Sequence, residues 1–175
     1  DNINYFFLSV GDTYYVNEKT IFKRKFITDN PKFIWKLEKE KKEILGYNCS
    51  SATTTFRGRK FKAYYTDELY KNFGPWKFNG LNGLILKIES EDGLYEFEAV
   101  NIDFNEKTNL LSEKKKLVEN IKPINWIEFE KEYLNEIKLE IERQKCNCEK
   151  DGNNVLRISR IEKIHPEVHD NGIMF

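Results

Sequence analysis

The sequence predicts a mainly β fold of the α+β class: a curved antiparallel meander sheet, or half-barrel, followed by one C-terminal helix. From residue 3 to about residue 104, short runs rich in Tyr, Phe, Ile and Thr alternate with Gly, Asp and Asn, which is typical of strands and turns. From about residue 126 to residue 145, apolar residues recur at helical spacing. We find no linker or internal repeat, so we expect a single domain over residues 1–175.

The strand assignments follow from alternation within each run. Residues 33–38 place Phe33, Trp35 and Leu37 on one face of a half-buried strand. Asp92 and Gly93 separate two alternating runs, and Asp-Gly in that position is a strong hairpin signal. Strands joined by such short connections pair antiparallel, with one buried and one water-facing side. The other expected strands cover residues 20–28, 41–47, 52–56, 59–66, 84–90 and 94–100.

The helix expected at residues 126–145 has a recognisable start. Asn125 is a good N-cap, and Glu128, three residues later, completes a capping-box-like pair. Glutamates recur at i+4, so packing against the sheet, rather than intrinsic propensity, must hold this helix. The packing stripe consists of Phe129, Tyr133, Ile137 and Ile141, with Trp126 and Leu134 beside it; the intervening Glu and Lys are expected to face water.

The composition excludes several classes of protein. The 29 basic and 29 acidic residues cancel, and no basic block is present, which argues against nucleic-acid binding. No apolar run is long enough to span a bilayer. The sequence also lacks a nucleophile elbow, a phosphate loop, a zinc-protease motif and a dinucleotide fingerprint, so it names no reaction.

Arg57 and Arg59 are the best candidates for binding an anion. They flank Gly58, and residues at i and i+2 of a strand share one face, so together they could clamp a carboxylate or phosphate. The alternative, which we favour, is a cross-strand ion pair with Glu or Asp on the water-facing side.

Two other groups in the β region are binding candidates. Gly80 and Gly83, with Gly74, would let a backbone approach a bound group, although the interpretation that we favour is a structural turn before the strand at 84–90. The aromatic residues offer an apolar groove in a curved sheet, or merely a core. They are Trp35, Trp76, Tyr64, Tyr65 and Phe78.

The C-terminal segment 146–175 holds the sharpest chemistry. Cys146 and Cys148 precede His165 and His169, and these four side chains suit Zn(II) or Cu(I). No other cofactor is predicted. A disulfide from Cys49 to Cys146 or Cys148 is the alternative that we favour, and three unpaired thiols are the third.

Linked motifs between residues 35 and 100 resemble the GLPGLI family of exported bacterial cell-envelope proteins. Asn82 stands where the family's hexapeptide has Pro, which keeps the turn but loses rigidity. The matching pieces are Trp35-Lys36-Leu37, Ile44-Leu45-Gly46-Tyr47-Asn48-Cys49 with Ala52, Phe56-Arg57-Gly58-Arg59, Ala63-Tyr64-Tyr65-Thr66, Gly74-Pro75-Trp76-Lys77-Phe78 and Gly80-Leu81-Asn82-Gly83-Leu84-Ile85-Leu86.

The resemblance implies a protein of the periplasm, the outer surface or the secreted fraction, and it implies no reaction. The sequence starts without Met or a signal-like region, so we expect that any targeting segment has been removed. We therefore expect a non-catalytic module that binds an envelope protein or an apolar small molecule. The alternatives are a metal-binding protein and an unrecognised enzyme, for instance a hydrolase using Cys49 or a carboxylate of Asp67 or Glu68.

Overall fold

The computed structural model describes residues 7–104, 116, 122–147, 155–156, 160, 162–164 and 173–174. The chain divides into two compact units. The fold is mostly β, with antiparallel and mixed sheets and one long helix, which confirms the predicted fold class. The single domain expected over residues 1–175 stays a prediction. Unit 1 comprises Asp1–Asn30, Lys107–Ser159 and Ile164–Phe175; unit 2 comprises Pro31–Glu106 and Arg160–Lys163.

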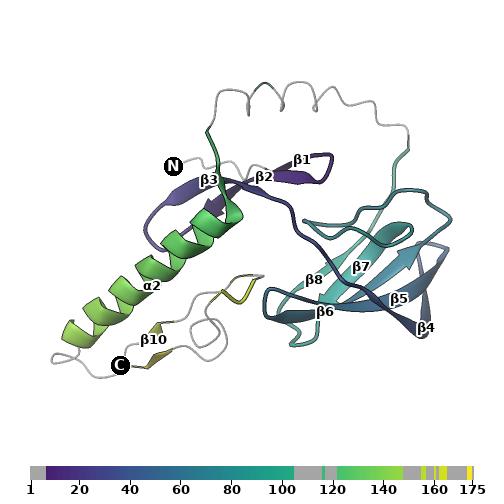
Figure 1. Ribbon diagram of the computed structural model, residues 1–175. Helices are drawn as coiled ribbons and strands as arrows, with labels where there is room; N and C mark the ends of the chain where they lie inside the picture. The colour runs from purple at the N-terminus through teal and green to yellow at the C-terminus, as the bar shows by residue number, and fades with distance from the viewer. Residues whose placement is uncertain are drawn as a thin grey trace. The chain divides into compact units, whose positions relative to one another are not determined.

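Unit 1 contains a four-stranded sheet and a helix (Figure 1). The first three strands form an antiparallel meander, and the fourth pairs parallel to the third. Helix α2 (Trp126–Asn147) follows the fourth strand directly. In sheet order, the strands are β1 (Phe7–Val10), β2 (Thr13–Lys19), β3 (Arg24–Asp29) and β9 (Ile124–Asn125); β10 (Val155–Leu156) and β11 (Ile173–Met174) form a separate antiparallel pair.

The apolar stripe of α2 forms the core of unit 1. Phe129, Tyr133 and Ile137 are almost fully buried, and they pack with Val16 and Ile27 of the sheet. The predicted helix and its packing stripe are therefore confirmed. Among the described residues, no helix is long and apolar enough to cross a membrane.

The glutamates of α2 correct one expectation. Glu136 and Glu140 are only 8% and 5% exposed, so the prediction that they face water is wrong. They lie at the margin of the buried face, where cations offset their charge. Glu132 pairs with Lys25 of β3 at 2.7 Å, and Glu140 accepts hydrogen bonds from Arg143. These partners relieve the like-charge repulsion at i+4.

The capping box at the start of α2 is present as predicted. The Glu128 amide donates to Asn125 Oδ1 at 3.0 Å, and the Asn125 amide donates to Glu128 Oε2 at 3.2 Å. We expect Asn125→Ala to lower the free energy of unfolding by about 1 kcal/mol, because one helix-terminal amide loses its acceptor. Urea denaturation measures this change. The control Asn135→Ala, at an exposed mid-helix position, should not destabilise the protein; equal losses in both variants would contradict a capping role.

Unit 2 is built on a five-stranded antiparallel meander, in which residues 67–83 form a long connection between the third and fourth strands (Figure 1). The register of the pairing shifts between Glu38 and Lys41 and again between Tyr64 and Tyr65, so the sheet contains two irregularities of the β-bulge type. In sheet order, the strands are β4 (Lys36–Ile44), β5 (Tyr47–Phe56), β6 (Arg59–Thr66), β7 (Leu84–Ser90) and β8 (Glu96–Glu98).

The break between the two sheets was not predicted. The sequence analysis placed one meander over residues 3–104, whereas the strands divide into two sheets after Asn30. Pro31 follows, and its nitrogen has no proton to donate to a strand ladder. The prediction that Phe33, Trp35 and Leu37 share one strand face is also wrong, because β4 begins only at Lys36. Leu37 is 66% exposed because β4 lies at the edge of the sheet.

One face of the unit 2 sheet is the core. Ala52, Ala63 and Ile88 are direct cross-strand neighbours and are at most 1% exposed. Phe61 and Phe78 pack into the same cluster. Because side chains alternate along a strand, the residues one position further on must point to the opposite face.

Candidate functional site

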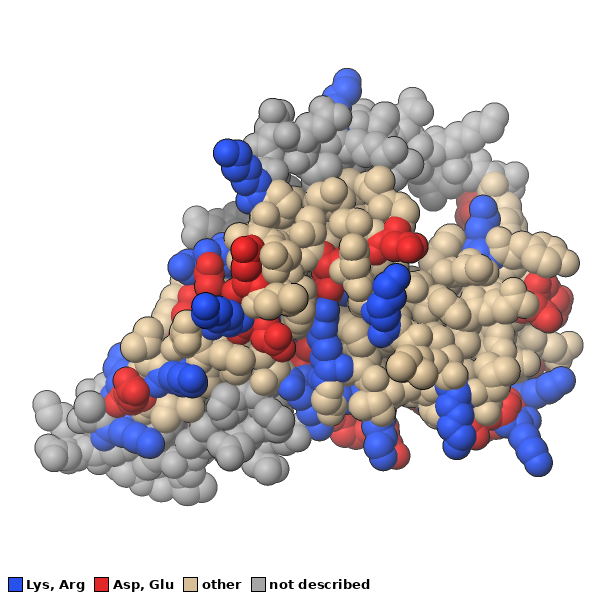
Figure 2. All heavy atoms as spheres, in the orientation of Figure 1, with Lys and Arg blue, Asp and Glu red and all other residues tan. Residues whose placement is uncertain are grey.

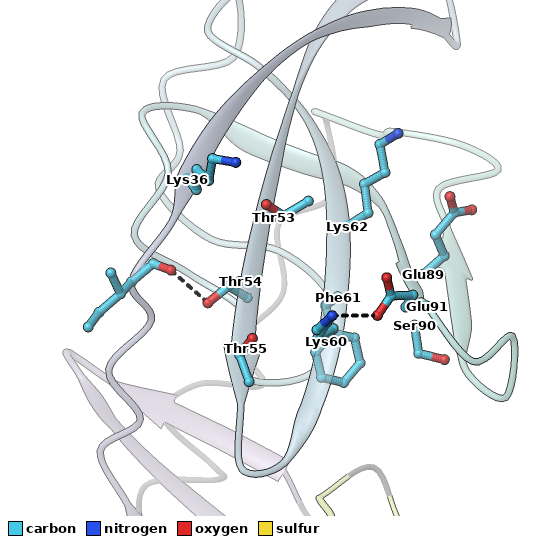
Figure 3. Close-up of a pocket in the computed structure, with 11 residues that line it drawn as sticks. Lys36, Thr53, Thr54, Thr55, Lys60, Phe61, Lys62, Glu89, Ser90 and Glu91 are labelled. Carbon is cyan, nitrogen blue, oxygen red and sulfur yellow. Dashed lines mark hydrogen bonds and ion pairs between the residues drawn. The ribbon is translucent and has the colours of Figure 1, made fainter.

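A hollow, called the polar hollow below, lies on the unit 2 sheet and is lined by polar side chains together with Phe61 of the aromatic core (Figure 3). It is open to solvent and has a volume of about 800 Å³. Ile34 and Lys36 lie at the β4 end, where the Ile34 carbonyl accepts a hydrogen bond from Thr54. The side chains that define the polar hollow below are Thr53, Thr55, Lys60, Lys62, Glu89 and Glu91.

The strand register brings these side chains together. Lys36 pairs with Thr53, Thr53 with Lys62, and Lys62 with Glu89, so one polar row crosses four strands. Figure 3 shows Thr53, Lys62 and Glu89 side by side on β5, β6 and β7. The hollow therefore presents hydroxyl, ammonium and carboxylate groups from a regular sheet rather than from loops.

A smaller hollow of about 460 Å³ adjoins this row and shares Thr53 and Lys62. Glu40 lies at its centre because the register shift in β4 places two extra residues there. The Glu40 carboxylate pairs with the Lys62 ammonium and accepts a hydrogen bond from the Tyr64 hydroxyl at 2.6 Å. Thr53 Oγ1 donates to Glu38 Oε1 at 3.2 Å. These contacts fix the orientation of the groups around the hollow.

The charges in this network are fixed near neutral pH. Hydrogen bonds from Lys62 and Tyr64 lower the pKa of Glu40, and the bond to Glu40 raises the pKa of Lys62. Burial raises the pKa of the Tyr64 hydroxyl. All three pKa values move away from neutrality, whereas a general acid or base works best with a pKa near the operating pH. The network suits hydrogen bonding rather than proton transfer.

An exposed ion pair closes the other end of the polar hollow. Lys60 Nζ lies 3.2 Å from Glu91 Oε2, and both side chains are about two-thirds exposed. The Glu91 amide also donates to the Lys60 carbonyl at 3.0 Å, which holds the β7–β8 turn against β6. Both charged groups remain accessible to a bound molecule.

Arg57 and Arg59 do not lie where the sequence analysis placed them. Arg57 is in the turn between β5 and β6 with φ of +43°, so the two arginines do not share a strand face. Arg57 Nη1 lies 3.2 Å from Glu162 Oε1, and the buried Arg59 guanidinium pairs with Asp92. Both guanidinium groups thus contact carboxylates of this chain, and binding of an external anion stays a prediction.

The aromatic candidates lie around the core cluster of unit 2. Trp35 Nε1 donates to the Asn79 carbonyl at 2.8 Å, and the Trp76 ring lies 5.2 Å from that of Phe78. Both tryptophans pack against the same buried cluster. They do not line the polar hollow.

Of the two glycines predicted as binding residues, Gly83 makes a close approach to backbone. Gly83 has φ of +143°, and a Cβ there would lie 2.1 Å from the Thr66 carbonyl oxygen. Gly80 has φ of +88° and faces the Trp35 indole. This geometry supports the interpretation of a structural turn. Neither glycine lines the polar hollow.

The Cys and His cluster falls almost entirely outside the described residues. Cys148, His165 and His169 are not described, nor is the side chain of Cys146, so a Zn or Cu site there stays a prediction. Within the described part of the chain, no group of three or more His, Cys, Asp or Glu residues could hold a metal. Cys49 is a free thiol buried beside Ile44, so the structure does not contain the disulfide expected from Cys49.

Sequence reasoning did not single out the residues of the polar hollow. The alternation in residues 52–56 and 59–66 was the available signal, because Thr53, Thr55 and Lys62 occupy the positions that alternate with the apolar ones. It did not show which residues of neighbouring strands pair. Figure 2 shows acidic and basic side chains interspersed on the visible surface, so charge alone does not mark the site.

A known protein-family model matches most of this chain. The model of the family described as "N-glycanase peptide, N-terminal domain" matches residues 12–128, about two thirds of the chain. The chain belongs to this family. The search of curated proteins found no match.

This N-terminal domain family replaces the resemblance proposed from short motifs. The match includes the whole stretch between residues 35 and 100, so the assignment to the GLPGLI family is wrong. The linked motifs that suggested it lie on strands and tight turns, such as the turn at Gly83, and these features recur in unrelated sheets.

Two solved structures of PNGF-II, in space groups C2 and P21, are also similar to this chain. Their sequences are 19% and 16% identical to it, with TM-scores of 0.46 and 0.42. Each match covers 85% of this chain and 24% of that chain, so the chain spans about a quarter of the length of the solved proteins.

Proposed function

We propose that this chain is a non-catalytic module of an N-glycanase-type protein and that its polar hollow binds the glycan of a glycoprotein. The polar row from Lys36 through Thr53 and Lys62 to Glu89 carries the proposal. Family membership supports it, because the family is named as the N-terminal domain of an N-glycanase peptide.

The hollow matches the chemistry of a sugar. Each sugar hydroxyl both donates and accepts hydrogen bonds, and the hollow offers both functions side by side. The ammonium groups of Lys60 and Lys62 donate, the carboxylates of Glu89 and Glu91 accept, and the Thr53 hydroxyl, whose proton is donated to Glu38, also accepts. Aliphatic stems and Ile34 supply the apolar surface that sugar C–H groups contact. The mixture of signs disfavours a polyanionic ligand.

The thiol alternative for an enzyme is not supported by the structure. Cys49 is fully buried, and burial raises the pKa of its thiol, which lowers the thiolate fraction at neutral pH. Asp67 and Glu68, the carboxylate candidates, are exposed, and Glu68 accepts a hydrogen bond from the Asn48 amide. A non-catalytic role for the described residues is therefore the simpler proposal.

We also propose that the module acts outside the cytoplasm. N-glycans are found on secreted and surface proteins, so a module that binds them must reach the same compartment. This proposal keeps the exported location expected from the sequence, but it rests on the ligand and no longer on the GLPGLI resemblance.

The test uses a soluble peptide that carries one high-mannose N-glycan, with calorimetry as the readout. The double variant Thr53→Val/Lys62→Met keeps most of the side-chain volume but removes a hydroxyl and an ammonium group. We expect its affinity to be at least about tenfold weaker, because a hydrogen bond to a charged group is worth roughly 1.5 kcal/mol or more. Thermal denaturation checks that the variant folds.

The controls are the same peptide without its glycan and the variant Lys71→Met, whose side chain is exposed away from the hollow. The bare peptide should not bind, and Lys71→Met should bind like the unmodified chain. Equal affinity in the double variant, or equal binding of the bare peptide, would rule out glycan recognition by the hollow.

A second candidate function has a specific observation behind it. An apolar groove of about 550 Å³ runs along β7 and β8, lined by Phe73, Ile85, Phe97 and Ile102 among others. It could hold the apolar small molecule or the envelope protein expected from the sequence. We rank it second because the family name points to glycoproteins.

A further inference from the structure

A short segment from far along the chain completes unit 2. Residues Arg160–Lys163, called the strap below, belong to this unit although the rest of its chain ends at Glu106. The Lys163 amide donates to the Arg57 carbonyl at 2.8 Å, at the turn between β5 and β6. Gly58 permits this approach, because a Cβ there would lie 2.9 Å from the Lys163 Cβ.

A buried carboxylate holds the strap in place. Glu162 is 2% exposed, and its Oε1 lies 3.2 Å from both Lys77 Nζ and Arg57 Nη1. Its other oxygen lies 3.5 Å from Arg160 Nη2. Lys77 is fully buried, so removal of the Glu162 charge would leave buried cations without this partner. Docking of the strap therefore depends strongly on this one side chain.

The strap also contacts the turn that forms one end of the polar hollow. Arg59 Nη2 donates to the Arg160 carbonyl at 3.2 Å, and the same guanidinium pairs with Asp92. Lys163 Nζ lies 3.7 Å from Asp92 Oδ2. Asp92 directly follows Glu91 in the β7–β8 turn, and Glu91 is held to Lys60 through its amide and its carboxylate.

We propose that the strap positions the Glu91 end of the polar hollow, so that docking of the strap and binding of a glycan in the hollow favour each other. The part of this proposal that concerns the glycan rests on the proposed function. Coupling of this kind is reciprocal: strap release weakens glycan binding, and bound glycan protects the strap. The strap is thus a regulatory contact built from residues about 70 positions away from the turn that it holds.

The experiment follows two backbone amides by hydrogen exchange and one affinity by calorimetry. The Lys163 amide reports on strap docking, and the Glu91 amide reports on the rim of the hollow. In Glu162→Gln we expect both amides to exchange at least about tenfold faster, while amides in the middle of β6 stay unchanged. The affinity for the glycosylated peptide should fall roughly fivefold or more.

Two further variants make the test decisive. Asp92→Asn removes the charge that pairs with Lys163 of the strap and with Arg59 of β6, and it serves if Glu162→Gln does not fold. It should speed exchange of the Glu91 amide. Glu43→Gln, at an exposed position on β4, is the matched control and should change neither amide.

Faster exchange at Lys163 with an unchanged Glu91 amide and unchanged affinity would overturn the inference and leave the proposed function intact. If the unmodified chain does not bind the glycosylated peptide, the proposed function fails. In that case the exchange rate of the Glu91 amide in Glu162→Gln tests the strap by itself. An unchanged exchange rate overturns the positioning role of the strap, and a faster one supports it.

Discussion

Gly83→Ala is expected to destabilise unit 2 by more than about 4 kcal/mol, among the largest effects for a single substitution. The added Cβ would lie 2.1 Å from the Thr66 carbonyl oxygen and 2.6 Å from its carbonyl carbon. Both atoms belong to backbone at the end of β6, so no side-chain rotation can relieve the overlap. The φ of +143° is also unfavourable for alanine. Urea denaturation followed by tryptophan fluorescence measures the loss.

Gly46→Ala is the matched control for this prediction. Gly46 also has positive φ, +82°, but nothing lies within 4 Å of a Cβ built there. We expect it to cost only about 1 kcal/mol, from backbone conformation alone. If the two alanine variants lost the same stability, the close approach of Gly83 to Thr66 would be refuted.

Phe78→Ala should lower the free energy of unfolding of unit 2 by about 3–5 kcal/mol, the usual cost of removing a buried aromatic ring. Phe78 is fully buried at the centre of the aromatic cluster. Its ring centroid lies 4.8 Å from that of Phe61, 5.1 Å from that of Phe33 and 5.2 Å from that of Trp76. Truncation leaves a cavity whose walls belong to several elements, so the site cannot collapse easily.

Tyr70→Ala provides the comparison for Phe78→Ala. The Tyr70 side chain is 92% exposed, and we expect its removal to change stability by less than about 0.5 kcal/mol. Chemical denaturation of both variants against the unmodified chain gives the difference. A small effect at Phe78, comparable to that at Tyr70, would show that the aromatic cluster is not the core of unit 2.

Local sequence signals predicted the helix well. The cap at Asn125 and Glu128 depends on residues three apart, and the buried stripe of α2 depends on a repeat of three to four residues. The alternation within residues 52–56 and 59–66 likewise predicted strands there, and both ranges lie in β5 and β6. Such features need no knowledge of distant parts of the chain.

The polar hollow and the strap depend on long-range contacts that alternation does not encode. The row from Thr53 to Glu89 requires the register of three strands, which includes a shift at Tyr64 and Tyr65. Glu162 meets Lys77 across 85 positions of sequence. Arg57 was assigned to a strand because the sequence did not show that Arg57 and Gly58 form the turn. The linked motifs misled the family assignment because each of them reflects only a local strand or turn.

Glycan binding by the polar hollow is tested most directly by an NMR titration of the isotope-labelled chain with the glycosylated peptide. We expect amide shifts to move in a saturable way at Thr53, Thr55, Lys60, Lys62 and Glu91, and to stay constant along α2. Shifts confined to Phe97 and Ile102 would favour the apolar groove instead. An unchanged spectrum at millimolar peptide would contradict glycan binding by this module.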